Sequence, residues 1–305
     1  MKAIVVTSFG GPEVMKYTDL DIPAISEDQV LIRVVATSVN FADIKLRYGK
    51  KENKALPFIP GIDATGIVER VGSHVKNIHP GQRVIAFPQN GSYAEYVVAN
   101  ENLTFVLPHE VDFQTAAACP IVSFTSYNLL ANVARLQQGE SVLIHAAAGG
   151  IGTTAIQLAK LLEAGADYVI CHQDEDFVEK VNELTNGEGV DVILDSISGT
   201  VSERSLNCLA YYGRLVHFGN ASGEIGNFQT KDLHASCRSI LGFSFGNTRK
   251  KRPELLQETA NEVFRYLRDG RLQIKATKSF PLQNAGKAHE WVESRKSTGK
   301  VILTV

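Results

Sequence analysis

A strand, a turn of small residues and a helix follow one another directly in the stretch VLIHAAAGGIGTTAIQLAKLL, residues 142–162. The opening run VLI is apolar and short enough for a buried strand, and good helix formers continue with helical spacing from Ile156. The turn between them reads Ala146-x-x-Gly149-x-x-Gly152. Small residues there let the backbone approach a pyrophosphate, and the helix N-terminus offers free N–H groups to its charge. The stretch predicts the opening of a dinucleotide-binding βαβ unit; the alternative is a merely tight turn.

Length and composition indicate a globular chain large enough for two domains. The 305 residues are 44% hydrophobic, and 31 Lys and Arg against 33 Asp and Glu give a net charge of −2. That balance gives no reason to expect nucleic acid or an anionic membrane as partner. The four cysteines form no C-x-x-C pair, which favours free thiols in a reducing cytoplasm over disulfides. No run reaches the ~18 apolar residues of a membrane helix and no export signal opens the chain, so we expect a cytoplasmic protein.

The sequence predicts mainly β-strands over the first ~120 residues. Short apolar runs are separated by turn residues, which is typical of a partly open barrel. The predicted strands are Lys2–Thr7, Gln29–Thr37, Ala64–Val71, Arg83–Phe87 and Tyr93–Ala99.

Near Asp112 the predicted secondary structure changes. Two helices come first, the second of which begins at Pro120, and alternating strands and helices follow. Such alternation predicts a parallel, doubly wound sheet. The predicted strands are Val142–His145, Tyr168–Cys171, Val190–Asp195, Arg214–Phe218 and Ser239–Phe243. The predicted helices are Gly152–Leu162, Glu175–Thr185, Val201–Leu209 and Pro253–Arg268. A tail with a helix (Gln283–Lys296) and a strand (Lys300–Val305) returns to the first domain.

The alternation is interrupted after Leu162. The second strand and second helix of a dinucleotide fold would need roughly 20 residues, and Glu163 leads almost directly to the next predicted strand. Without them the first strand has an open edge. Either a segment is omitted from this sequence, or the protein has a genuine deletion. We favour omission because a true loss would exceed the 5–15 kcal/mol stability of a typical domain. Consecutive Cα atoms lie about 3.8 Å apart, so the Leu162–Glu163 separation would distinguish the two.

Several motifs in a fixed order resemble the zinc-independent quinone oxidoreductases of the medium-chain dehydrogenase/reductase superfamily. They run nearly from end to end of the chain. They are VNFADIKLRYG (39–49), PFIPGIDATGIVERVG (57–72), GQRVIAF (81–87), HAAAGGIGTTAIQLAK (145–160), DVILDSISG (191–199), GRLVHFGNASG (213–223) and TGKVILTV (298–305).

The resemblance implies an α/β protein with a GroES-like β-barrel domain, residues 1–122 and 270–305, and a Rossmann domain with a doubly wound parallel sheet, residues 123–269. It implies NADPH as cofactor, hydride transfer to quinones or α,β-unsaturated carbonyls in an interdomain cleft, and a homodimer. In the family, the region missing after Leu162 contacts the adenosine 2′-phosphate. The preference for NADPH over NADH therefore depends on resemblance alone.

The resemblance also argues against zinc. Zinc enzymes of the superfamily use Cys, His and Cys ligands, and the corresponding positions here are the stretch containing Asn40, then Ile62, and a position near Ile121. Catalytic zinc needs three protein ligands and an open position. We therefore expect metal-free chemistry.

The predicted catalytic residues are Asn40 and Tyr48. The Asn40 amide would donate to a substrate oxygen or to the nicotinamide ribose; the alternative is a turn residue that satisfies nearby backbone. Tyr48 would line the cleft or form an exposed rim. Asp43 is expected to pair with Arg47 at helical i,i+4 spacing. The sequence offers no convincing proton donor, which favours quinones because a reduced quinone can take its proton from water.

The resemblance assigns the cofactor contacts to the turn, to a helix start and to segments after later strands. The hydroxyl of Thr125 would face the nicotinamide or only bond its own helix, and His172 would contact the adenosine or face solvent. The predicted contacts are Asn40, Thr125, Ala148, Gly149, Gly150, Ile151, Gly152, His172, Phe218, Gly219, Asn220, Phe243, Phe245 and Lys300. Asp195 and Ser196 are expected to form a turn or helix cap.

Two other functions stay open at this level. A 2-enoyl-thioester reductase would share both domains and would need a channel for a long acyl carrier. A non-catalytic NADPH-binding protein would bind the cofactor without hydride transfer, and a genuine deletion after Leu162 would favour it.

Overall fold

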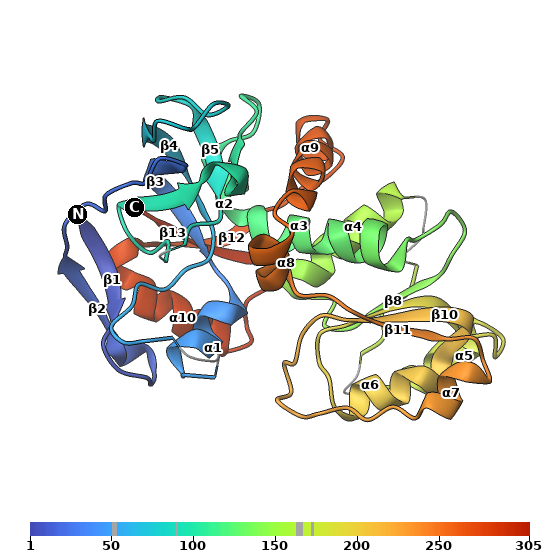
Figure 1. The fold of residues 1–305 in the computed structure, drawn as a ribbon. Helices are drawn as coiled ribbons and strands as arrows, with labels where there is room; N and C mark the ends of the chain where they lie inside the picture. The colour runs from blue at the N-terminus through green and yellow to red at the C-terminus, as the bar shows by residue number, and fades with distance from the viewer. Residues whose placement is uncertain (51–53, 90, 163–166, 172–173) are drawn as a thin grey trace. The chain divides into compact units, whose positions relative to one another are not determined.

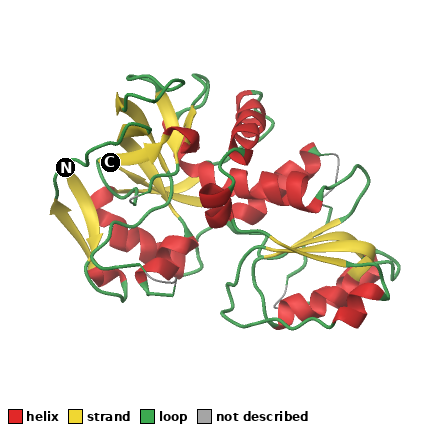
Figure 2. Ribbon diagram, viewed as in Figure 1, coloured by secondary structure: helices red, strands yellow, loops and turns green. Residues whose placement is uncertain are grey.

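The structure is a computed structural model that describes residues 1–50, 54–89, 91–162, 167–171 and 174–305. The chain forms two compact units (Figures 1 and 2). The first contains Met1–Phe124 and Arg249–Val305, and the second contains Thr125–Thr248. The first division lies close to the predicted one at residue 122. The second lies well before residue 269, so that helix α9 (Leu255–Arg268) groups with the first unit.

The first unit is built on a sheet with the strand order β12-β13-β3-β4-β5-β7, with β6 beside β3. The strands are β3 (Gln29–Val39), β4 (Ala64–Val71), β5 (Arg83–Ala86), β6 (Tyr96–Asn100), β7 (Thr104–Val106), β12 (Ala276–Pro281) and β13 (Lys300–Thr304). Alternate residues of β3, Val30, Ile32 and Val34, pack in one core with Val68 and Val84. This period of two is what places one face of each strand inside.

Two short strands and several helices complete the first unit. Strands β1 (Lys2–Val6) and β2 (Met15–Asp19) pair antiparallel. The helical segments are η1 (Pro12–Val14), α1 (Phe41–Arg47), η2 (Glu101–Leu103), α2 (Phe113–Ala118), α9, η5 (Leu282–Asn284) and α10 (Ala285–Glu293). Helix α2 begins after Asp112, whose carboxylate accepts the N–H groups of Gln114 and Thr115, as an N-cap residue should.

The second unit holds a parallel sheet with the order β11-β10-β9-β8, formed by β8 (Val142–Ile144), β9 (Val190–Asp195), β10 (Leu209–His217) and β11 (Ser239–Gly242). Helix α4 lies on one face of the sheet and α5, α6 and α7 on the other (Figure 1). The helical segments are α3 (Pro120–Tyr127), η3 (Asn128–Ala134), α4 (Gly150–Leu161), α5 (Phe177–Leu184), α6 (Thr200–Ser205), η4 (Leu206–Cys208), α7 (Thr230–His234) and α8 (Phe245–Lys251). Segments α3 and α8 each continue across a division between the units.

The predicted strand at Tyr168–Cys171 is wrong. This segment is irregular, and the side chains of Tyr168 and Val169 are 69% and 94% exposed. An extended segment is held by hydrogen bonds to a neighbouring strand. In the described part of the chain β8 is the last strand of its sheet, so the segment has no strand to pair with.

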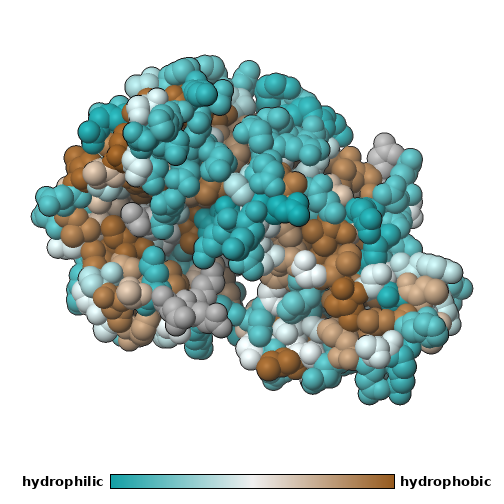
Figure 3. Space-filling model, viewed as in Figure 1, coloured by the Kyte–Doolittle hydropathy of each residue, from teal (hydrophilic) through white to brown (hydrophobic). Residues whose placement is uncertain are grey.

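All three residues of β8 are half-buried, although they read as a buried strand. Apolar atoms also reach the surface of the second unit in Figure 3. The predicted open edge on the first strand is thus observed among the described residues. The junction Leu162–Glu163 lies outside them, so omission and deletion both stay open. No helix in the described ranges is long and apolar enough to cross a membrane.

Candidate functional site

The second unit brings several predicted cofactor residues to one edge of its sheet. The strands are parallel, and Ile144, Leu194 and Val216 are in register, as are His217 and Gly242. The carboxyl ends of β8, β9, β10 and β11 therefore lie along the same edge, which is where open α/β sheets bind ligands. The segments that follow these strands are Ala146–Gly149, Ser196–Ser198, Phe218–Asn220 and Phe243–Ser244.

The glycine turn after β8 forms a close-packed cradle at the start of α4. Gly149 is the N-cap and Gly150 the first helical residue, so the first N–H groups of the helix face away from its own turns. A Cβ on Gly152 would lie 2.6 Å from both the Cα and the carbonyl oxygen of Ala147. No side chain fits there. Ala148 and Ile151 complete the turn, and the geometry suits an anion at the helix N-terminus.

The hydroxyl of Thr125 is buried, and the next residue in the chain, Ser126, contacts this cradle. Thr125 of α3 is 4% exposed, and its Oγ1 has no hydrogen-bond partner among the described residues. The alternative prediction, a bond to its own helix, is therefore not seen. Its neighbour Ser126 donates to the carbonyl of Ile151 at 3.0 Å. An unsatisfied buried hydroxyl is unfavourable by about 1–3 kcal/mol, so a ligand that bonds it would relieve this cost.

Asp195, at the end of β9, organises the adjoining turn. Its Oδ1 accepts the N–H groups of Ile197 at 2.8 Å and Ser198 at 3.2 Å, and its Oδ2 accepts the Ser202 hydroxyl. Burial alone would raise the pKa of Asp195, but these hydrogen bonds hold that pKa below its ordinary value. The prediction of a turn residue at this position is confirmed.

The segment after β10 is fixed by backbone contacts. The N–H of Phe218 donates to the Asp195 carbonyl at 2.9 Å, and Gly219 lies against Ser196. Asn220 accepts the N–H of Gly223 through Oδ1 at 2.6 Å. These contacts hold the loop at the ligand edge of the sheet.

Phe243 donates its N–H to the carbonyl of His217 at 3.0 Å, and Phe245 is the first residue of α8. His172 lies outside the described residues. The roles of Phe243, Phe245 and His172 stay predictions.

In the first unit the structure brings Asn40 and Lys300 together. Asn40 precedes α1, and its backbone N–H donates to Asp43 Oδ2 at 2.9 Å. Its Oδ1 accepts Lys300 Nζ at 2.7 Å. Its Nδ2 lies 3.2 Å from Asp63 Oδ2 and 3.1 Å from Ser38 Oγ. Both ends of the amide are therefore held by side chains of the same unit.

Asp63 is the anion of this cluster, and the sequence did not single it out as a site residue. It is fully buried, and its carboxylate accepts the Ser38 N–H at 3.1 Å and the Ser38 hydroxyl at 2.9 and 2.8 Å. Lys300 is also buried, and its Nζ donates to the Val39 carbonyl at 3.2 Å. Burial lowers the pKa of Lys300, and Asp63 and Asp43 oppose that shift.

A second buried network joins α1 to α10. The Nη1 of Arg47 donates to His289 Nδ1 at 3.0 Å, and its Nη2 contacts both carboxylate oxygens of Glu293 at 2.9 Å. Because Nδ1 accepts, His289 carries its proton on Nε2, which lies 3.0 Å from the hydroxyl of Tyr93. Tyr93 in turn donates to Asp43 at 3.5 Å. Burial and Arg47 lower the pKa of His289 to about 3.

Tyr48 lies at the end of α1 with an exposed side chain, and the guanidinium of Arg47 is 4.5 Å from its ring centroid. Lys45, which the sequence did not suggest as a site residue, lies on the same helix; burial and the nearby Lys50 lower its pKa.

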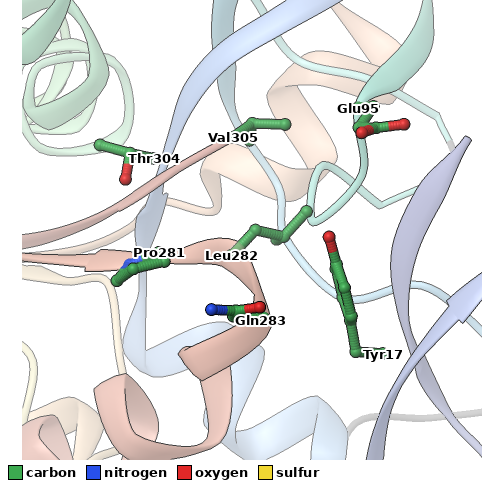
Figure 4. A pocket seen from close by; sticks show the side chains of 7 residues that line it. All are labelled: Tyr17, Glu95, Pro281, Leu282, Gln283, Thr304 and Val305. Atoms are coloured by element: carbon green, nitrogen blue, oxygen red, sulfur yellow. The ribbon is translucent and has the colours of Figure 1, made fainter.

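In the described parts of the chain, no three His, Cys, Asp or Glu side chains are grouped as a metal site requires. At the position predicted to correspond to the zinc-ligating histidine, Ile62 offers only its carbonyl, which accepts Arg249 Nη1 at 3.0 Å. The one pocket drawn in Figure 4 lies elsewhere in the first unit. Tyr17, Glu95 and Leu282 are among its lining residues, and it contains no predicted site residue.

Two family models match the chain. The alcohol dehydrogenase GroES-like domain matches residues 26–109, and the model described as zinc-binding dehydrogenase matches residues 164–303. Quinone oxidoreductase of Sus scrofa is 35% identical over 325 aligned positions, which cover 99% of this chain and 97% of that protein.

Solved structures give the same result. The crystal structure of Escherichia coli quinone oxidoreductase complexed with NADPH matches with a TM-score of 0.92 and 32% identity, covering 100% of both chains. Quinone oxidoreductase of Pseudomonas syringae pv. tomato matches with a TM-score of 0.93 and 31% identity, covering 100% of this chain and 99% of that one.

The alignment with the Sus scrofa protein also shows how many residues this chain lacks relative to that protein. Its 325 positions contain about 302 residues of this chain, which is 99% of 305, so about 23 positions of the relative have no counterpart here. That number agrees with the roughly 20 residues that a second strand and helix need. The location of the shortfall after Leu162 stays a prediction.

The predicted fold, a GroES-like domain and a Rossmann-type domain, is thereby confirmed. Full-length identity above 30%, both domains and the motifs in their expected order agree. The chain belongs to the quinone oxidoreductase family of the medium-chain dehydrogenase/reductase superfamily.

Proposed function

We propose that this chain is an NADPH-dependent, zinc-independent oxidoreductase that transfers hydride to quinones or α,β-unsaturated carbonyls. The observation that carries the proposal is the cradle at Gly149–Gly152, together with the buried hydroxyl of Thr125, which has no hydrogen-bond partner among the residues that the structure describes. A cradle that excludes side chains and an orphaned donor both fit a bound dinucleotide. Related proteins have been solved as complexes with NADPH.

When bound, the nicotinamide supplies the hydride; the chain supplies position and electrostatics. The first N–H groups of α4 bind the pyrophosphate, and Thr125 offers its hydroxyl to the cofactor. Asn40 stays the candidate donor to the substrate oxygen, on which negative charge develops during hydride transfer. The residues at the zinc-ligand positions, Asn40 and Ile62 among them, suit a reaction that needs no metal, because quinones and enones are already electron-poor.

We further propose a homodimer in the cytoplasm. The family resemblance supports the dimer, and the absence of a C-x-x-C pair favours a reducing cytoplasm. The near-neutral net charge of −2 gives no reason to expect a membrane or nucleic-acid partner. Light scattering coupled to size-exclusion chromatography tests the dimer directly; a single monomeric species at micromolar concentration would contradict it.

Stopped-flow oxidation of NADPH with a panel of quinones and enones tests the reaction. We expect turnover with at least one quinone, and unchanged rates after exhaustive treatment with a chelator. A parallel titration with NADH measures how much cofactor preference the chain retains. No turnover with any member of the panel, despite NADPH binding, would contradict the proposal and favour a non-catalytic NADPH-binding protein.

Gly152→Val tests the cradle itself. Because a Cβ there would overlap Ala147, we expect NADPH binding to weaken at least 100-fold by nicotinamide fluorescence. Gly286→Ala is the matched control, since a Cβ at Gly286 meets its nearest atom at an ordinary 3.5 Å. Wild-type affinity in a folded Gly152→Val variant would remove the cradle from the binding site.

A further inference from the structure

A histidine ring is held beside the ligand edge of the sheet in the second unit. His217 is the last residue of β10 and lies opposite Asp195, the last residue of β9, in the parallel register. The Nδ1 of His217 lies 3.4 Å from Asp195 Oδ2. Asp195 is fully buried, and its carboxylate also accepts the N–H groups of Ile197 and Ser198 in the turn after β9. One carboxylate therefore holds both this turn and the imidazole at the carboxyl ends of the strands.

This carboxylate determines which nitrogen of His217 is left for a ligand. The hydrogen bonds of Asp195 hold its pKa below the ordinary value, and an ionised carboxylate only accepts, so Nδ1 carries a proton in this pair. Nε2 has no hydrogen-bond partner among the described residues, and the side chain is 37% exposed. A carboxylate that bonds one ring nitrogen orients the ring and so aims the other nitrogen. His217 thus presents an oriented nitrogen at an open position.

A second histidine beside Asp195 has a different environment. His145 directly follows β8, next to the end of β9. Its Nε2 lies 2.9 Å from the hydroxyl of Ser205, and its ring packs edge-on against Phe177 with 5.0 Å between the ring centroids. These contacts join His145 to helices α5 and α6, so we assign its ring to packing. His217 has no such contact with a helix in the described part of the chain.

The strand order places His217 on one half of a dinucleotide. A dinucleotide fold binds the pyrophosphate after its first strand, and the residue that binds the adenosine ribose follows the second strand, on one side of the first. Strands β9, β10 and β11 lie on the other side, which is where the nicotinamide half binds. Strand β10 is two strands from β8, about 10 Å at the usual spacing. His217 is therefore set beside the nicotinamide riboside and not beside the pyrophosphate.

We propose that Nε2 of His217 binds the nicotinamide riboside of the cofactor, and that Asp195 is the positioning residue that holds the ring for this contact. The inference rests on the proposed function, because it concerns the same cofactor site. The riboside carries hydroxyl groups and a carboxamide, which donate and accept hydrogen bonds, and a neutral imidazole accepts through Nε2. His217, Asp195 and the cradle all belong to the second unit, so this contact requires no residue of the first.

Two substitutions of His217 separate the bond to Asp195 from the bond to the riboside. The amide nitrogen of asparagine is as many bonds from Cβ as Nδ1, and that of glutamine is as many bonds from Cβ as Nε2. His217→Asn therefore keeps a donor for Asp195 and removes the outer group, whereas His217→Gln keeps an outer polar group. His234→Asn is the matched control, because His234 is exposed and lies on α7 of the same unit.

NADPH binding, followed by nicotinamide fluorescence, is the first readout. We expect His217→Asn to bind NADPH about 5- to 10-fold more weakly, the effect of one lost hydrogen bond, and His217→Gln to lose less. His234→Asn should bind within about twofold of wild type. The melting temperature of His217→Asn should stay within about 2 °C of wild type, because the bond to Asp195 is kept.

A fragment of the cofactor locates the contact. 2′-Phosphoadenosine 5′-diphosphate contains the pyrophosphate but lacks the nicotinamide riboside, so its affinity by calorimetry should be the same in wild type and in His217→Asn. Wild-type affinity of His217→Asn for NADPH would overturn the inference. An equal loss for NADPH and the fragment would also overturn it, because the substitution would then act on the pyrophosphate or on the fold.

NMR of ¹⁵N-labelled histidine side chains is a readout independent of affinity. The Nε2 resonance of His217 is identified by its absence from the spectrum of His217→Asn. NADPH should shift this resonance, and the fragment should leave it in place. A resonance that saturating NADPH does not move would overturn the inference.

The inference and the proposed function fail in different ways. A wild type that shows this binding pattern but turns over no quinone or enone contradicts the proposed reaction, and the histidine contact stands. A wild type that reduces quinones, with a His217→Asn variant that binds NADPH normally, overturns the inference alone.

Discussion

The two units differ in how their buried polar groups and strand edges are satisfied. In the first unit, Arg47, His289, Tyr93 and Asp43 form one connected network around a paired sheet. In the second, β8 is the last strand of its sheet within the described ranges, and all its residues are half-buried. The first unit therefore has polar side chains that are bonded by neighbours from distant parts of the chain. The second has the glycine turn that we propose to bind the pyrophosphate, beside an incompletely covered strand.

This difference matters for the cofactor. The sheet order β11-β10-β9-β8 runs one way along the chain, whereas a dinucleotide fold reverses direction next to its first strand. The cradle and the loops after β9, β10 and β11 all belong to the half of the sheet that the described residues form. The described residues thus form one side of the proposed cofactor site but not the other.

The largest expected effect breaks the network of the first unit. Arg47→Met leaves the half-buried Glu293 and the buried His289 without their charged donor, so we expect the unfolding free energy to fall by about 3–5 kcal/mol. Urea denaturation followed by fluorescence measures it. The control is Arg33→Met, whose exposed pair with Glu69 should contribute less than about 1 kcal/mol. Equal losses in both variants would show that the network has no special weight.

The next prediction compares the same change on two paired strands of the second unit. Leu194→Ala in β9 removes a fully buried side chain and should destabilise the unit by about 2–5 kcal/mol. Leu143→Ala in β8 removes a half-buried one, so we expect clearly less, on the order of 1 kcal/mol. Equal losses at both positions would mean that β8 is covered in solution and its edge is not open.

A pH test addresses the first unit again. The pKa of His289 is lowered to about 3, so the folded state favours the neutral ring. The contribution of His289 to the free energy of unfolding is complete above its unfolded-state pKa of about 6.5, and it is lost as the pH falls toward 3. Between pH 7 and pH 5 this loss amounts to about 2 kcal/mol. Denaturation at the two pH values should show it in wild type and in His109→Gln but not in His289→Gln. An unchanged slope in His289→Gln would assign the acid sensitivity to other groups.

The smallest expected effect lies in the segment wrongly predicted as a strand. Val169 is 94% exposed, so Val169→Ser should change the unfolding free energy by no more than about 0.5 kcal/mol. Thermal and urea unfolding both report it. A loss above 1.5 kcal/mol would show that Val169 is buried in solution, and would support a covered β8 edge.

Local signals in the sequence predicted much of the fold. Strands β4 and β9 have the predicted bounds, and α4 begins within the predicted glycine turn. The strand predicted from the apolar run YVI (residues 168–170) is not formed, because an apolar run shows only that its side chains can be buried. Tyr168 can be part of a strand only if a neighbouring strand accepts and donates its backbone hydrogen bonds. The local sequence does not show whether such a neighbour exists.

The site shows the same limit. Asn40 and Lys300 were each predicted from a motif, but nothing in the sequence indicated that they would touch, because they are 260 positions apart. Tyr93 and His289 are separated by 196 positions and Arg47 and His289 by 242, so the contacts of His289 in the second network were not predicted. For this network the sequence suggested only that Asp43 and Arg47 would pair. A lone histidine or tyrosine carries no signal of its partner.

The sequence by itself determined the strand–turn–helix at residues 142–162, because strand period, small residues and helix spacing are local properties of the chain. It also determined that a strand and a helix are too long to fit after Leu162. Only the tertiary structure decided that Lys300 bonds the Asn40 amide, that His289 is held neutral between Arg47 and Tyr93, and that β8 is the last strand of its sheet in the part of the chain that is described. These depend on strand register and on burial, which bring together groups that no local pattern connects.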